Sequence, residues 1–98
     1  MSHPLQAIKD SDSALFDKIT GTKEFAFQEG KLSKKHKLLI ALALDVSKYA
    51  ENGIRSLTNQ AMENGASKEE VMETLRIVNY ICGAGSMYAA ASALKDVL

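Results

Sequence analysis

The sequence has few of the residues that cross-link a chain or interrupt its helices. Its 98 residues include one cysteine, one proline and no tryptophan. The single cysteine, Cys82, cannot form a disulfide within the chain and is typical of a reducing compartment. The only proline is Pro4, so the residue that most strongly breaks helices is missing from the rest of the chain. The sequence therefore permits long helices without disulfide support.

The sequence also has no excess of positive or negative charge, since twelve basic side chains balance twelve acidic ones. Nucleic-acid binding depends largely on basic surfaces, so this balance argues against a nucleic-acid partner. No apolar run approaches the roughly 18–20 residues that cross a bilayer, which argues against a membrane partner. Residues 1–5 do not resemble a signal peptide. We therefore expect a cytoplasmic protein.

Apolar residues, by contrast, are plentiful for so short a chain. A chain of this length forms one domain, which we place over residues 1–98, and buries only about two-thirds of its unfolded surface. Yet 46% of the residues are hydrophobic. We expect the surplus apolar surface to be covered by self-association into a homo-oligomer.

The apolar residues recur with helical spacing, and nothing alternates with period two for long. The pattern predicts an all-α fold of about five to six helices. The first half should form a helix over 12–20 that stops at Gly21, a short helical turn over 22–29 and a central helix capped by Ser33. Residues 38–44 are apolar on every side, so this helix should be surrounded. A bend or break is expected at 50–53, after which the helical pattern continues through Met62.

The second half contains a strong helix-start signal. Ser67 and Glu70 have the spacing of a capping box, which predicts a helix start there after a stop at Asn64–Gly65. Ser86 should cap a last, alanine-rich helix that packs closely on a neighbouring helix or on a second subunit. On the helix that begins after Ser67, one stripe of residues should be buried: Val71, Leu75, Val78 and Cys82.

Three segments together resemble the carboxymuconolactone decarboxylase family, which includes the AhpD-like (alkylhydroperoxidase-like) peroxidases. They are residues 32–43, LSKKHKLLIALA; residues 61–71, AMENGASKEEV; and residues 80–83, YICG. The resemblance is strongest over 32–94. It implies an AhpD-like helical domain with a central helical hairpin, assembled as trimers or hexamers.

The resemblance also implies where catalytic groups would stand. AhpD-like members have a Cys-x-x-Cys pair, a His four residues later and a Glu one helix earlier. There, one thiolate attacks the oxidised substrate, the second thiol resolves it, and nearby bases set the thiol pKa. Here these positions fall on non-ionisable residues: Leu38 for the Glu, Ala50 and Gly53 for the thiols, and Leu57 for the His. Leu57 also replaces the histidine of the decarboxylase branch, so no catalytic residue is assigned.

Other side chains remain candidates for lining a pocket: Tyr49, Glu51, Asn52, Tyr80 and Cys82. Tyr49, Glu51 and Asn52, with Arg55 and Asn59, either surround a remnant pocket or form an exposed helix face. Cys82 lies on an apolar stripe, so we expect it to be buried and unreactive. The alternative is a peroxidatic thiol.

The remaining polar residues indicate no metal and no cofactor. His36 has no second ligand at helical spacing, so a surface histidine is expected. The lysines nearby either form a solvated face, which we favour, or bind an anion or a neighbouring subunit's carboxylate. These are Lys31, Lys34, Lys35 and Lys37.

Two classes of function follow. The first is a family protein that has lost the redox dithiol and acts as a non-redox oligomer in binding or assembly, with a small molecule as a possible ligand. The alternative is an enzyme in a remodelled pocket. That enzyme would be a peroxidase or antioxidant through Cys82, or would use Tyr49, Glu51 or Tyr80 in decarboxylase or lactone chemistry.

Overall fold

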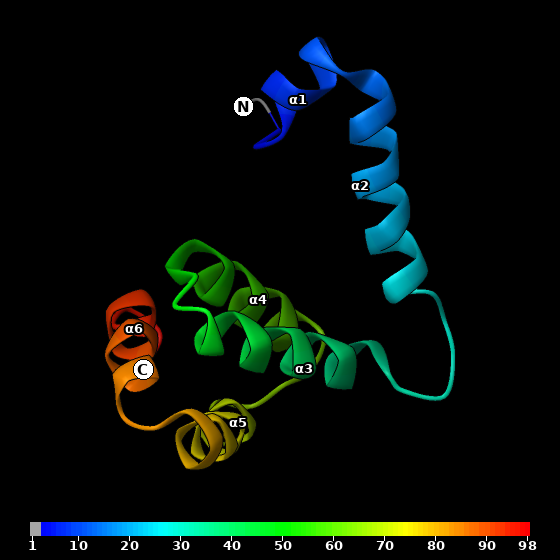
Figure 1. Cartoon of the computed structure of the whole chain (residues 1–98). Coiled ribbons are helices and arrows are strands. Elements are labelled where there is room, and N and C mark those ends of the chain that lie inside the picture. The colour runs from blue at the N-terminus through cyan, green and yellow to red at the C-terminus, as the bar shows by residue number, and fades with distance from the viewer. Residues whose placement is uncertain (1–2) are drawn as a thin grey trace. The chain divides into compact units, whose positions relative to one another are not determined.

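The computed structural model describes residues 3–98, which form six α-helices and no strand (Figure 1). The predicted all-α fold is confirmed. The chain divides into two compact units, one ending at Gly30 and one running from Lys31 to Leu98. The helices are α1 (Gln6–Ser11), α2 (Ser13–Ala26), α3 (Lys34–Ser47), α4 (Glu51–Glu63), α5 (Lys68–Cys82) and α6 (Gly85–Leu94).

The first unit is a pair of helices, α1 and α2, with no buried residue in its described part, residues 3–30. Asp12 caps α2, because its side chain accepts a hydrogen bond from the Leu15 N–H at 3.0 Å. Helix α2 continues through Gly21 to Ala26, so the predicted stop at Gly21 is wrong. Glycine disfavours a helix by only about 1 kcal/mol, which the neighbouring residues offset.

The second unit is built on a hairpin of α3 and α4, which lie side by side and confirm the predicted hairpin (Figure 1). Ser33 caps α3 by accepting from the His36 N–H, as predicted. Helix α4 ends at Glu63, and Gly65, which follows the C-cap residue Asn64, has a φ of 97° that suits a glycine stop. Residues 48–50 connect the two helices, so the expected interruption of the central segment is real.

Helices α5 and α6 complete the second unit. The capping box of α5 is confirmed, since the Glu70 N–H donates to Ser67 Oγ at 3.0 Å and the Ser67 N–H donates to Glu70 Oε1 at 2.9 Å. The predicted cap of α6 is wrong. Ser86 is buried inside the helix and donates to the Gly83 carbonyl instead, because α6 already begins at Gly85.

One apolar core holds these four helices together. Small alanine side chains let α6 approach its neighbours within the same chain, α4 and α5. No helix among residues 3–98 combines the length and hydropathy needed to cross a membrane. The buried core residues are Leu42, Val46, Ile54, Val71, Leu75, Val78, Ala89, Ala90, Ala93 and Leu94.

Helix α3 is covered on one side only. Leu38, Leu42 and Val46 are buried. By contrast, Ile40 is 49% exposed and Leu44 is 58% exposed. Within the second unit only one face of α3 meets other helices, and the expectation that this helix is surrounded on every side stays a prediction.

Candidate functional site

The corner between α3 and α4 contains the positions where the family resemblance places the two thiols. Helix α3 ends in a Schellman motif: the Ala50 N–H donates to the Asp45 carbonyl at 3.0 Å, and the Tyr49 N–H donates to the Val46 carbonyl at 3.1 Å. This motif requires a left-handed residue, usually glycine. Here Tyr49 adopts that conformation, with φ 61°. A bulky side chain with positive φ is strained, and such strain is common at functional sites.

The Tyr49 side chain reaches the start of α6. Its hydroxyl lies against Gly85, where any added Cβ would meet the phenol oxygen. Glycine at position 85 therefore makes room for the tyrosine ring. Because Gly85 lies three residues after Cys82, Tyr49 lies beside the connection between α5 and α6.

A carboxylate covers the first turn of α4. Asp45, in the last turns of α3, packs its side chain directly against Gly53. A Cβ at position 53 would overlap the carboxylate, so this position needs glycine while Asp45 stays there. The first turn of a helix exposes unpaired N–H groups and suits a negative charge. No side chain caps α4 by a hydrogen bond. The sequence analysis did not identify Asp45 as a site residue, because it lies more than a helical turn before Ala50 and Gly53, the two thiol positions.

The four motif positions fill space and have no reactive group. Leu38 is 1% exposed. Leu57 is half-buried and packs against the core. Ala50 and Gly53 are half-buried at the start of α4. None of these side chains can transfer a proton or attack a substrate.

The polar residues after the corner lie on an outer face of α4. Tyr49, Glu51 and Asn52 are all exposed. Arg55 Nε donates to the Ala93 carbonyl at 3.2 Å, and Arg55 Nη1 donates to Asn52 Oδ1 at 3.4 Å. Arg55 thus joins α4 to the last turn of α6, where a cation is favoured by the helix dipole. The exposed-face interpretation fits this arrangement, and the pocket role of these residues stays a prediction.

Cys82 and Tyr80 lie at the end of α5 and are exposed, Tyr80 at 85%. The prediction that Cys82 is buried is wrong. Val71, Leu75 and Val78 follow the buried stripe as expected. Cys82, however, is the last residue of α5, and the chain turns away at Gly83 with φ 80°, so no other helix of the second unit covers the thiol.

Lys35, in the basic cluster, forms an ion pair within the second unit. Lys35 Nζ lies 2.9 Å from Glu70 Oε2, which joins the start of α3 to the start of α5. The Lys35 hydrogen bond and then the Ser67 N–H lower the pKa of Glu70 below its ordinary value of 4.5. His36 is exposed, with Nδ1 2.7 Å from Ser33 Oγ. Within residues 3–98, no three His, Cys, Asp or Glu side chains are arranged to hold a metal ion.

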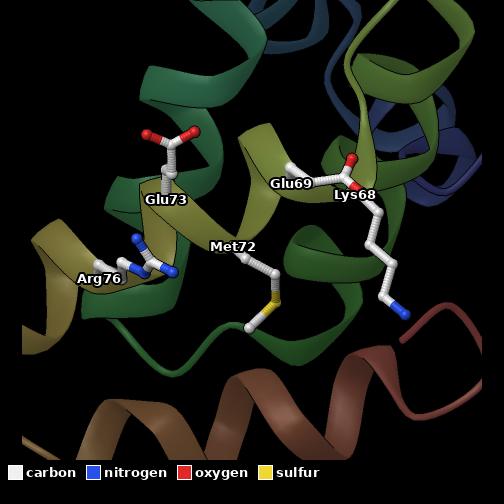
Figure 2. Close-up of a pocket in the computed structure, with 5 residues that line it drawn as sticks. All are labelled: Lys68, Glu69, Met72, Glu73 and Arg76. Atoms are coloured by element: carbon white, nitrogen blue, oxygen red, sulfur yellow. The ribbon is translucent and has the colours of Figure 1, made fainter.

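Helix α5 borders hollows on its surface. A shallow hollow of about 340 Å³ along this helix is lined by charged residues around Met72 (Figure 2). Figure 2 shows Met72 and Lys68 directed towards α6 and Glu73 directed away from it. Between α3 and α5, a groove of about 400 Å³ is almost entirely apolar. It is lined by Leu32, His36, Leu39, Ile40, Ala43, Leu44, Thr74 and Ile77.

Comparison with known proteins identifies the relatives of this fold. Residues 13–96 match the sequence model of the carboxymuconolactone decarboxylase family. The chain belongs to this family. A crystal structure of a carboxymuconolactone decarboxylase family protein from Legionella pneumophila matches with a TM-score of 0.86 and 32% identity, over 93% of this chain and 81% of that one.

Two further relatives are uncharacterized proteins. One, from Cupriavidus necator, is 33% identical over 86% of this chain and 75% of its own length. The other, from Methanocaldococcus jannaschii, is 23% identical over 95% of this chain and 87% of its own length. In this carboxymuconolactone decarboxylase family protein, Asp45 packs against Gly53. Gly53 stands where the resemblance to AhpD-like members places the second thiol.

Proposed function

We propose that this chain is a non-redox member of the carboxymuconolactone decarboxylase family, which acts in binding or assembly as a homo-oligomer. The contact between Asp45 and Gly53 carries this proposal. A thiol at position 53 would need a Cβ where the carboxylate now lies. The packing therefore supports a site in which both cysteines are absent and the Asp45 carboxylate occupies the space that a side chain at position 53 would need.

The surrounding residues support the same proposal. A dithiol mechanism needs an attacking thiolate, a resolving thiol and a base that sets the thiol pKa. Ala50 replaces the first thiol, and the two positions expected to carry the acid and the base are Leu38 and Leu57. Both leucines pack with the apolar interior. The rebuilt site thus contributes to folding stability.

The exposure of Cys82 favours a second candidate function, a single-thiol peroxidase. In that reaction the thiolate attacks a peroxide and releases an alcohol, which leaves a sulfenic acid on Cys82. Two equivalents of an external thiol then return the sulfenic acid to the thiol and form a disulfide between themselves. Decarboxylase or lactone chemistry by Tyr49, Glu51 or Tyr80 remains a prediction from the sequence.

Peroxide reduction separates these candidates. Purified protein mixed with an organic peroxide and a dithiol reductant should show no turnover above buffer. The Cys82→Ser variant is the matched control, because this exposed position tolerates serine without loss of packing. Turnover that disappears in Cys82→Ser would establish the single-thiol reaction. Turnover that survives in Cys82→Ser would show a different catalytic group, and either result would refute a non-redox protein.

We also propose the trimer or hexamer that the family resemblance implies, in the cytoplasm. The exposed apolar residues of α3 support self-association. The single, exposed and unpaired thiol supports a reducing compartment. Light scattering at micromolar concentration should give three or six times the chain mass of 10.6 kDa. A monomer at that concentration would refute the oligomer.

A further inference from the structure

We draw no further inference here: the strongest candidate, the apolar groove between α3 and α5 around Ile40, Leu44 and Ile77, is an exposed apolar face, and nothing in the structure shows what covers it.

Discussion

Replacing Thr58 by valine should stabilise the protein. Thr58 lies on α4 with no exposed surface, and its Oγ1 has no hydrogen-bond partner within the described part of the chain. A buried hydroxyl without a partner costs about 1–3 kcal/mol. Valine has nearly the same shape and, like threonine, a branched Cβ, so the packing and the helical backbone are retained. The added methyl contributes about 0.8 kcal/mol more by apolar burial.

We therefore expect Thr58→Val to raise the free energy of unfolding by about 2–4 kcal/mol, the sum of the two contributions. Urea denaturation gives this quantity directly, and a thermal melt gives a second measure. For a chain of this length, each 1 kcal/mol shifts the melting temperature by about 4–8 °C. Parent and variant must be compared at one protein concentration, because the stability of an oligomer depends on concentration.

Thr74→Val is the matched control for this substitution. Thr74 Oγ1 donates to the Glu70 carbonyl at 2.9 Å, so its hydroxyl is already satisfied within α5. Its removal should lower the free energy of unfolding by about 0.5–1.5 kcal/mol. If Thr58→Val also melts at or below the temperature of the parent, the Thr58 hydroxyl has a partner, such as a buried water. The reasoning from an unpaired donor would then be refuted.

Three further substitutions test the corner and the ion pair by denaturation. Gly53→Ala should cost about 1–3 kcal/mol by overpacking against Asp45. It should cost little in an Asp45→Ala background, and an equal cost in both backgrounds would contradict the contact. Leu57→Ala should cost about 2–3 kcal/mol as a core truncation, whereas no loss would indicate a solvated cleft at Leu57. Glu70→Gln should destabilise at pH 7. Because the folded pKa of Glu70 is lowered, the stability gained from its charge is present above pH 4.5 and lost as the pH falls below it. The difference from the parent should therefore shrink in acid, and a difference that persists there would exclude the charge as its cause.

The features that the sequence predicted correctly depend on residues close to one another in the chain. The caps at Ser33 and Ser67 depend on side chains within three residues, so short patterns identify them. Cys82 was misplaced because a buried stripe on a helix does not reveal where the neighbouring helices end. The stop at Gly21 was wrong for a related reason, since a glycine ends a helix only where the chain turns.

The candidate site was harder to predict than the fold. The replacement of the motif residues is visible in the sequence, but the group that occupies their place is not. Asp45 and Gly53 lie eight residues apart on different helices, and the left-handed Tyr49 between them brings them together. A tyrosine in that conformation contradicts the usual preference for glycine at the end of a helix. The groove between α3 and α5 likewise depends on how two helices that are not consecutive in the chain pack together.

The packing of Asp45 against Gly53 also bears on how this branch of the family can evolve. A cysteine introduced at position 53 alone would bring the new side chain into the carboxylate, so that substitution is disfavoured before any activity could be selected. A change at Asp45 would have to come first, and alone it would remove the negative charge that covers the start of α4. A path to dithiol chemistry at this corner thus begins with steps that bring no benefit by themselves. Single substitutions are therefore a poor route from this chain to a dithiol enzyme.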